Sequence, residues 1–252
     1  MWLDRIVSEL STILEPESFA DYGPNGLQVP GPADVQTVVT GVSANERLHL
    51  SAAEAGAQLV LVHHGLFWDG MPRHVDRALY RRLKPLFEHE MGLLAYHLPL
   101  DAHPEHGNNA LLAEALGCEH RTPAFAHQGR PIGTEAAFGG EGIGVDELRA
   151  RVTRATDREP LVLDYGPERV RTIGIVTGAG ASYLDEAIAR GHDAFLTGEP
   201  AERVMAEARE AGIHFIAAGH HATETFGVRR LGDLISQRFG VKSVFIDDPN
   251  PI

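Results

Sequence analysis

Apolar residues along the chain follow two alternating periods, one helical and one typical of strands. Residues 3–14 place apolar side chains at three- and four-residue spacing, which predicts an amphipathic helix. Residues 37–42 and 58–62 are apolar runs of strand length, and a predicted helix over 45–55 lies between them. A helix over 76–90, which Pro85 should kink or split, leads to a third strand at 93–96 and a helix over 108–116. This alternation predicts an α/β fold with a mainly parallel sheet.

The second half of the chain repeats this order of elements. Residues 172–178, 193–197 and 213–218 match the three strands, and helices are predicted over 182–190, 200–211 and 221–238. The first strand of each half ends in Thr-Gly, and Gly198-Glu199 takes the place of His63-His64. We therefore predict two related βαβ-type lobes that arose by internal duplication, although βαβ units also resemble one another without common origin.

The stretch between the two predicted lobes, residues 121–168, contains more Gly, Pro and Arg than its surroundings. It is expected to contain strands at 132–138 and 161–165 and a helix at 145–156. We place the boundary near Thr122-Pro123, which gives lobes of residues 1–122 and 123–252. Later in the chain, residues 177–182 join a strand to a helix, and they predict a tight turn because the third glycine of a dinucleotide fingerprint is missing.

Composition narrows the function classes. The chain has 22 Lys+Arg and 35 Asp+Glu, so its net charge is −13, which argues against a nucleic-acid partner. A single cysteine excludes an internal disulfide and a cysteine-based zinc site. No apolar stretch approaches the roughly 20 residues of a membrane span. We expect a globular cytoplasmic protein without a membrane partner, and its 14 histidines are its unusual feature.

Imidazoles and carboxylates follow three of the predicted strands. His63 and His64 end one strand, Asp101 follows another, and His220 and Glu224 follow a third. Ligands of open α/β sheets bind outside the carboxyl ends of the strands, so these groups are expected in one crevice between the lobes. Each has an ordinary alternative: a packed or surface histidine pair, a helix-capping Asp101, and a solvated His-Glu pair. Their joint occurrence favours a metal site.

Spacing limits how these groups can bind metal. Adjacent residues on a strand point to opposite faces, so His63 and His64 would serve two neighbouring ions. His220 and His221 both share a helical face with Glu224, and geometry does not choose between them. Three imidazoles and two carboxylates cannot saturate two metals, which leaves positions for water, as in catalytic sites. The mixed donor set fits zinc, manganese, iron, cobalt or nickel.

Other polar residues border the expected site. His97 is either a proton shuttle or a packed residue. Asn108 and Asn109 either contact substrate or cap the following helix, and capping is favoured. Glu199 adds an acid to the crevice. The remaining histidines, apart from His103 and His106 in a solvated loop, show no ligand spacing and are expected to be structural or exposed.

Ordered motifs across nearly the whole chain carry a family resemblance. They are residues 22–29, 63–68, 97–101, 107–110, 197–199 and 219–224. Together they resemble the dinuclear metal-centre proteins known as GTP cyclohydrolase 1 type 2 homologues. The resemblance implies that two metal ions are held by His63, His64, Asp101, His220 and Glu224, so it favours His220 over His221. It also implies a homo-oligomer, commonly a hexameric ring.

Two functions are consistent with this site. The first is a divalent-metal-dependent hydrolase, in which metal-activated water attacks an electrophilic centre. The resemblance narrows this to opening the purine ring of GTP towards dihydroneopterin triphosphate, so the partner is a small molecule, GTP or another nucleotide. The alternative is a non-enzymatic metal-binding, regulatory or scaffold protein without nucleotide turnover.

Overall fold

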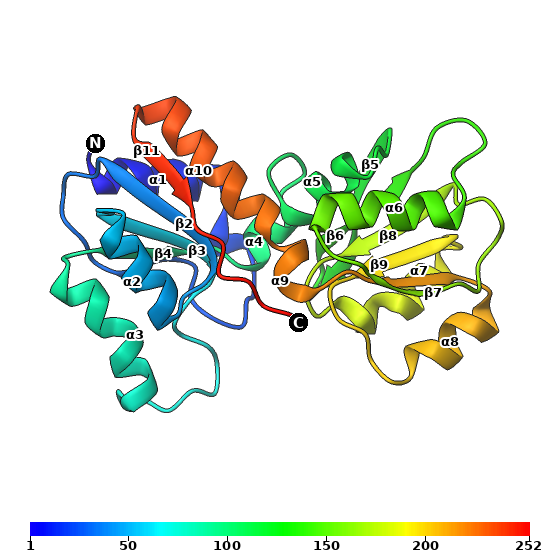
Figure 1. Cartoon of the computed structure of the whole chain (residues 1–252), viewed down its shortest axis with the longest axis horizontal. Helices are drawn as coiled ribbons and strands as arrows, with labels where there is room; N and C mark the ends of the chain where they lie inside the picture. The colour runs from blue at the N-terminus through cyan, green and yellow to red at the C-terminus, as the bar shows by residue number, and fades with distance from the viewer. The chain divides into compact units, whose positions relative to one another are not determined.

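The computed structural model describes residues 1–252, which form two compact units. Unit 1 comprises Met1–Leu100 and Gly227–Asp248, and unit 2 comprises Asp101–Phe226 and Pro249–Ile252. Each unit contains its own β-sheet flanked by helices, as the sequence predicted for an α/β fold (Figure 1). The expected boundary near Thr122-Pro123 lies inside unit 2. Secondary structure shows no helix of sufficient length and apolar character to cross a membrane.

Unit 1 is built on a five-stranded sheet of order β1-β4-β3-β2-β11. Its elements are α1 (Leu3–Leu14), η1 (Pro16–Ser18), β1 (Gly26–Val29), β2 (Thr37–Ser43), α2 (Glu46–Glu54), β3 (Leu59–His64), α3 (Arg77–Glu88), β4 (Gly92–Ala95), α10 (Thr225–Phe239) and β11 (Lys242–Phe245). The short helix α4 (Leu98–Ala102) follows β4 in the chain and leads into unit 2. Strands β11, β2, β3 and β4 are parallel, and β1 pairs antiparallel with β4 at the edge.

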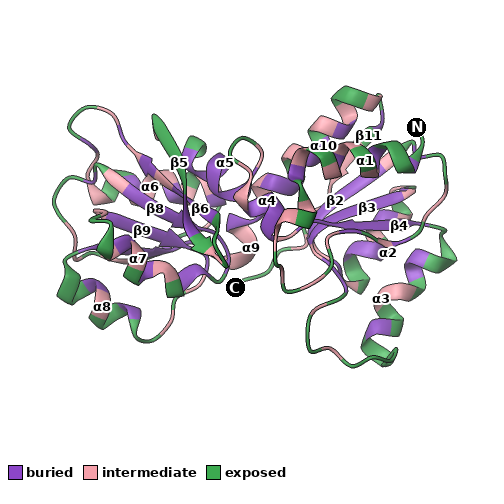
Figure 2. Ribbon diagram, turned by 180° about the vertical axis from the view of Figure 1, so that it is seen from behind, coloured by how far each residue is buried: buried purple, intermediate pink, exposed green.

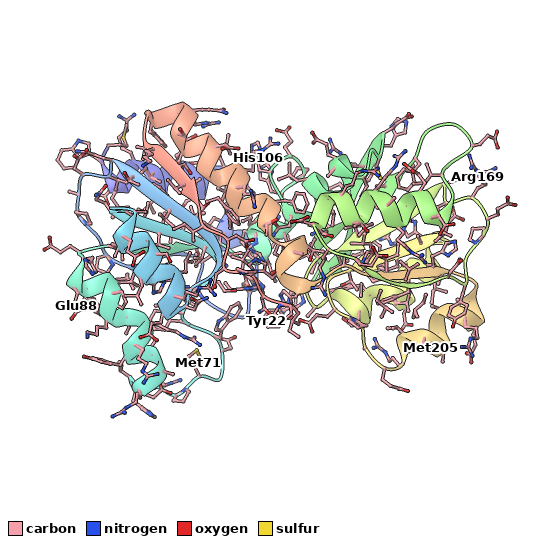
Figure 3. The ribbon with its side chains drawn as sticks, in the orientation of Figure 1. Tyr22, Met71, Glu88, His106, Arg169 and Met205 are labelled. Atoms are coloured by element: carbon pink, nitrogen blue, oxygen red, sulfur yellow. The ribbon has the colours of Figure 1, made fainter.

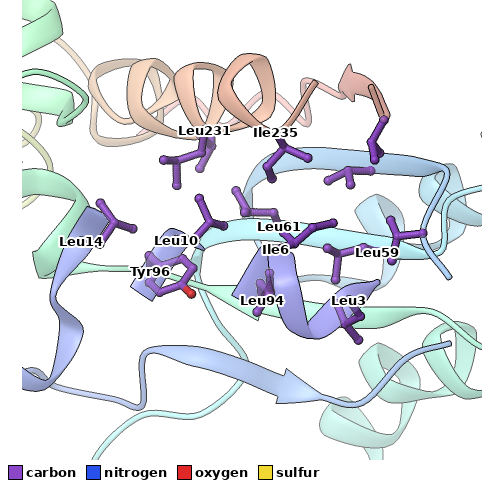
Figure 4. Packing of buried hydrophobic residues seen from close by; sticks show 14 of the residues in the cluster. Leu3, Ile6, Leu10, Leu14, Leu59, Leu61, Leu94, Tyr96, Leu231 and Ile235 are labelled. Atoms are coloured by element: carbon purple, nitrogen blue, oxygen red, sulfur yellow. The ribbon is translucent and has the colours of Figure 1, made fainter. Parts of the chain in front are cut away.

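Alternate residues of the central strands serve opposite faces of this sheet. Leu59 and Leu61 of β3 pack in one cluster with α1 and α10, whereas Val60 and Val62 pack in another with α2 and α3. Figure 4 shows the first cluster, in which Ile6 and other α1 side chains meet the sheet and α10. In Figure 2 the central strands β3 and β4 are buried, and exposed residues lie on the outer helix faces. Burial on both sheet faces explains why β3 is a continuous apolar run.

The helix expected to close the second lobe instead belongs to unit 1. Residues 221–238 form two helices, α9 (His220–Thr223) and α10, and α10 buries Val228, Leu231 and Ile235 against α1 and β2–β4. The chain then adds β11 in parallel to β2, a strand that the hydrophobic pattern did not reveal. Lobe membership of this segment therefore depends on tertiary packing that its own amphipathic pattern does not specify.

Unit 2 is built on a six-stranded sheet of order β5-β6-β8-β9-β10-β7. Its elements are α5 (Asn108–Ala115), β5 (His120–His127), β6 (Arg130–Ala137), α6 (Val145–Thr156), β7 (Leu161–Leu163), β8 (Thr172–Val176), η2 (Gly180–Tyr183), α7 (Leu184–Ala189), β9 (Ala194–Thr197), α8 (Val204–Ala211), β10 (His214–Ala217) and α9. Strands β8, β9 and β10 are parallel, and β7 pairs antiparallel with β10. The β5–β6 hairpin extends the other edge.

The two units repeat one pattern, as the duplicated sequence predicted. In each, a helix precedes an antiparallel edge strand and three parallel strands joined by helices: α1-β1-β2-α2-β3-α3-β4 in unit 1 and α6-β7-β8-α7-β9-α8-β10 in unit 2. One hydrogen-bonding arrangement also recurs just before the second parallel strand of each unit. Gln58 Oε1 accepts hydrogen bonds from the backbone N–H groups of residues 36 and 37, and Asp193 Oδ2 accepts them from those of residues 171 and 172.

This repeated hydrogen-bonding arrangement shows which residues of the two units are equivalent, and it corrects the alignment that we made from the sequence. Gln58 and Asp193 are equivalent, as are Thr37 and Thr172, each pair 135 positions apart (193 − 58 and 172 − 37). Because β2 continues to Ser43, Thr40-Gly41 does not end its strand, and Ser43 is the residue equivalent to Gly178. The shared Thr-Gly dipeptide therefore misaligns these strands by two residues, whereas the match of His63-His64 with Gly198-Glu199 is retained.

Pro85 does not split its helix as expected. Helix α3 runs from Arg77 to Glu88 with Pro85 in its last turn. Because proline there removes only its own N–H, a single hydrogen bond to residue 81 is lost. The neighbouring Arg82 carbonyl lies 2.7 Å from Nδ1 of the buried His49 on α2, and Leu79 and Leu86 pack in the core cluster on the same side. These contacts hold the last turn in helical form.

Candidate metal centre

His63 and His64 end β3 and carry two of the imidazoles expected to bind metal. His63 is fully buried, and its Nδ1 lies 2.9 Å from the Tyr96 carbonyl oxygen at the end of β4. His64 is partly exposed, and its Nδ1 lies 3.0 Å from Ser43 Oγ at the end of β2. The two ring centroids are 4.7 Å apart, so the side chains converge at the strand end despite their adjacent positions. In each ring Nδ1 lies beside a protein oxygen, and histidines oriented in this way bind metals through Nε2.

The turn after these histidines is held by a side chain from β1. Gln28 Oε1 accepts a hydrogen bond from Leu66 N at 2.7 Å, and Gln28 Nε2 donates to the Pro24 carbonyl at 2.8 Å. Gly65 makes this possible, because a Cβ there would lie 2.3 Å from Gln28 Nε2. The glycine after the histidine pair is thus required by close packing at the strand end.

His97 lies at the end of β4 and joins the two histidines of β3. Its ring centroid is 5.0 Å from that of His63 and 5.6 Å from that of His64, and nitrogen atoms of the three rings lie within 4.8 Å of one another. We expected His97 beside the pocket. The structure places it close enough to be a third imidazole donor of unit 1.

A buried carboxylate fixes the orientation of His97. Asp21 Oδ1 lies 2.6 Å from His97 Nδ1, and Asn25 Oδ1 accepts a hydrogen bond from the His97 backbone N–H at 2.7 Å. Burial raises the pKa of Asp21, but hydrogen bonds and the charge of His97, together with hydrogen bonds from Asn25 and the Tyr22 backbone, hold this pKa below its usual value. Tyr22, half-exposed and labelled in Figure 3, lies in the same loop, with its ring 6.2 Å from that of His97. Sequence analysis did not single out Asp21, because its partner is 76 residues away.

Asp101 belongs to unit 2, although we expected it in the first lobe. Its Oδ1 accepts hydrogen bonds from Asn108 Nδ2 at 2.8 Å and from Thr177 Oγ1 at 3.2 Å. Asn109 Nδ2 donates to the Asp101 carbonyl at 3.1 Å, and Asn109 Oδ1 accepts from Thr177 N at 2.8 Å. The expectation that the asparagines cap the following helix is wrong: Gly107 is the N-cap of α5, without a side-chain cap. Instead, Asn108 holds the carboxylate of Asp101 and Asn109 holds its backbone carbonyl.

His220 and Glu224 are brought together by the short helix α9. His220 Nε2 lies 3.2 Å from Glu224 Oε2, and His220 Nδ1 is in close contact with Glu199 Oε1 at the end of β9. Glu224 is buried. Burial lowers the pKa of His220, but hydrogen bonds and charges of Glu224 and Glu199 outweigh this effect and raise the pKa to about 9. An imidazole between two carboxylates is an electrostatic environment that attracts cations.

The turn at Gly178 forms a wall of this group. Gly178 has a φ of +66°, and a Cβ there would lie 2.2 Å from Glu224 Oε1 and 3.1 Å from His220 Nε2. Its N–H donates to Thr223 Oγ1 at 3.1 Å, and its carbonyl accepts from the N–H groups of Gly198 and Glu199. The segment 177–182 is therefore the tight turn that we expected, and its glycine makes room for two of the expected donors. From the sequence alone, nothing linked this glycine to Glu224 or His220.

Comparisons with known proteins identify the family. The family model DUF34/NIF3 (NGG1p interacting factor 3) matches residues 1–251. The chain belongs to the DUF34/NIF3 family. A relative from Pseudomonas aeruginosa named GTP cyclohydrolase 1 type 2 homolog is 46% identical over 249 residues, covering 99% of this chain and 98% of the relative. A relative of the same name from Escherichia coli (strain K12) is 42% identical over 250 residues, with the same coverage.

Solved structures of similar proteins share the fold of this family member. One, described as protein ybgI of unknown function, matches with a TM-score of 0.93 and 40% identity over 100% of both chains. A protein from Thermus thermophilus matches with a TM-score of 0.92 and 37% identity, again over both whole chains. Groups of His, Asp and Glu side chains that could hold a metal ion accompany this fold in the present chain.

Proposed function

We propose that this protein is a dinuclear divalent-metal-dependent hydrolase of the GTP cyclohydrolase type, which opens the purine ring of GTP towards dihydroneopterin triphosphate. In this proposal the five residues His63, His64, Asp101, His220 and Glu224 hold two metal ions. The names of the relatives support a GTP-related substrate, since several are called GTP cyclohydrolase 1 type 2 homolog at 38–46% identity.

The observation that carries this proposal is the orientation of the expected ligands within each unit. Every imidazole engages a protein oxygen through Nδ1: His63 with a backbone carbonyl, His64 with a hydroxyl and His220 with a carboxylate. Metal-binding histidines characteristically use one ring nitrogen in this way and bind the metal through the other.

The donor set also fits the proposed ions. Imidazole nitrogen with carboxylate oxygen, and no thiolate, suits zinc, manganese, iron, cobalt or nickel. Asp101 and Glu224 are both buried, and buried carboxylates require compensation by hydrogen bonds or a cation. Divalent cations at a dinuclear centre activate water as a nucleophile and stabilise developing negative charge.

The chain's own residues would organise proton transfer beside this centre. Asp21 holds Nδ1 of His97, so His97 Nε2 is the atom that accepts or delivers a proton during ring opening. The Asn25 hydrogen bond to the His97 backbone fixes the position of the ring along the chain. His97 thereby takes the role of general acid/base, while Asp21 determines which nitrogen is free.

Metal analysis combined with a fluorescence assay for neopterin formation from GTP tests this proposal. Wild type loaded with zinc, manganese or iron is expected to hold two metals per chain and to turn GTP over. Glu224→Ala should lose both properties, whereas Glu210→Ala, which removes an exposed acid of α8, should retain them. Fewer than two metals in the wild type would contradict the dinuclear centre. Full loading without GTP turnover would contradict the hydrolase and support a metal-binding protein instead.

The proposal includes self-assembly. The family resemblance leads us to propose a homo-oligomer, specifically a hexamer. Light scattering coupled to size-exclusion chromatography should give six times the 27.3 kDa chain mass. A monomeric mass would contradict this part of the proposal without affecting the metal-binding part.

A further inference from the structure

We infer that Glu199 is a positioning residue that orients the His220 imidazole for metal binding. The inference rests on the proposed metal centre and assigns to the carboxylate of Glu199 a role distinct from that of a ligand. Glu199 Oε1 contacts His220 Nδ1, while Nε2 on the other side of the ring lies 3.2 Å from Glu224 Oε2. When Nε2 binds a metal, the ring proton stays on Nδ1, which donates it to Glu199.

The backbone holds Glu199 in this place. The N–H groups of Gly198 and Glu199 donate to the Gly178 carbonyl at 2.9 and 3.0 Å, and Gly219 N donates to the Gly198 carbonyl at 2.9 Å. Strand β9 and the start of α9 approach so closely that a Cβ on Gly198 would lie 2.6 Å from His220 Cα. Glu199 therefore starts from a fixed point beside His220, and its side chain reaches Nδ1 from there.

Glu199 differs from the partners of the other expected ligands. His63 Nδ1 faces a backbone carbonyl and His64 Nδ1 faces a serine hydroxyl, so Glu199 is the only one of the three partners that carries a charge. A carboxylate on the distal nitrogen raises the basicity of an imidazole ligand more than a neutral partner does. We therefore expect the His220 orientation to be the one most sensitive to replacement of its partner.

The repeated fold gives an independent reason for this assignment. Glu199 occupies in unit 2 the position of the expected ligand His64 in unit 1, 135 residues earlier in the same register (199 − 64). The end of the second parallel strand thus carries an imidazole in unit 1, and the equivalent position in unit 2 carries a carboxylate. In unit 2 the imidazole comes instead from the start of α9, and the strand-end residue orients it.

Zinc affinity of the full chain, measured by competition with a chelating dye, tests the inference. Glu199→Ala is expected to weaken zinc binding by about 10- to 100-fold, the usual cost of removing such a partner. Glu199→Gln should lose less, because its amide oxygen still accepts a hydrogen bond from Nδ1. Glu202→Ala, which removes an exposed acid three residues away, should bind zinc as the wild type does.

Two further measurements separate positioning from folding. Without metal, the circular dichroism spectra of Glu199→Ala and Glu202→Ala should both match that of the wild type. In the zinc-loaded wild type, ¹⁵N NMR should show the His220 proton on Nδ1, and this signal should be lost or shifted in Glu199→Ala. Zinc affinity within twofold of wild type in Glu199→Ala would overturn the inference. Equal losses in the Ala and Gln variants would also overturn it, because the hydrogen bond that Gln retains would then contribute nothing to the orientation of the ring. A wild type that binds no zinc would instead overturn the proposed metal centre.

Discussion

Units 1 and 2 share one pattern of strands and helices but place different chemistry at equivalent positions. Where β3 ends in His63-His64, β9 is followed by Gly198-Glu199. Where Ser43 contacts the His64 ring, the equivalent Gly178 leaves space beside Glu224 and His220. The imidazoles of unit 1 are presented by strand ends, and that of unit 2 by a helix start. The framework is common to both units, whereas the residues at its strand ends differ between them.

The largest expected effect breaks the unit 1 donor set. His63→Ala should abolish detectable zinc binding at one of the two proposed positions, at least a 100-fold loss, because it removes a fully buried imidazole that we propose as a ligand. Metal content by mass spectrometry or atomic absorption checks this result. His89→Ala, an exposed histidine at the end of α3, is the control. Retention of two metals in His63→Ala would show that unit 1 contributes donors in another way.

His97 sharpens the same comparison. His97→Gln should retain both metals and lose about 100-fold or more in turnover, as expected for loss of a general acid/base. Metal analysis and the neopterin assay on the same sample distinguish the roles. Loss of a metal in this variant would make His97 a third imidazole ligand of unit 1, which its proximity to His63 and His64 also permits.

His49 of α2 should make the stability of the protein depend on pH, whereas the equivalent residue of unit 2 should not. Burial lowers the pKa of His49 to about 4, with a smaller contribution from Arg82 and a partial offset by the Arg82 backbone. The unfolded chain therefore takes up this proton first as the pH falls from 6.5 to 4, and stability decreases by about 3 kcal/mol over that range. The equivalent residue of unit 2 is Leu184, which does not titrate.

Replacement of His49 by the unit 2 residue tests this difference. His49→Leu should remove about 3 kcal/mol of the acid-induced destabilisation between pH 6.5 and 4. Urea unfolding of both proteins across this range gives the difference directly, because all other titrating groups are common to them. Parallel pH profiles would show that His49 is not held neutral by burial.

A smaller effect is expected at Gly178. Gly178→Ala introduces a Cβ 2.2 Å from Glu224 Oε1 at a left-handed backbone position, which should cost about 2 kcal/mol of stability. Zinc affinity should fall as well, since Glu224 must move. Gly191→Ala also lies at positive φ, +74°, but with nothing within 4 Å of its Cβ, so it measures the backbone cost alone. Equal destabilisation by both substitutions would show that contact with Glu224 is unimportant.

The smallest effect is expected at Gln58 and Asp193, whose equivalent hydrogen bonds define the alignment of the two units. Asp193→Ala should destabilise the protein by about 1–2 kcal/mol and Gln58→Ala by about 1 kcal/mol, because a charged acceptor is lost in one case and a neutral one in the other. Urea unfolding at pH 7 measures both values. A larger cost for Gln58→Ala would contradict the equivalence of these residues.

Local sequence determined those strands and helices whose apolar pattern alone specifies their type and extent. Apolar runs fixed the central parallel strands of both units, since burial on both faces leaves no room for polar residues. The amphipathic spacing of α1 and the glycines after α2 and α7 fixed those helices and their ends. The ordered His, Asp and Glu motifs were sufficient for the family and for the candidate ligands.

Only the tertiary structure decided which groups act on those ligands. Asp21 and His97 are 76 positions apart, and Glu199 and His220 are 21 apart, so no local pattern links them. The same holds for α10, whose amphipathic pattern does not specify a unit and which packs in unit 1. Strands β1, β5 and β11 were missed because edge strands are short or mixed in polarity. Sequence periodicity reports how each segment is buried, whereas long-range hydrogen bonds and packing decide what each segment touches.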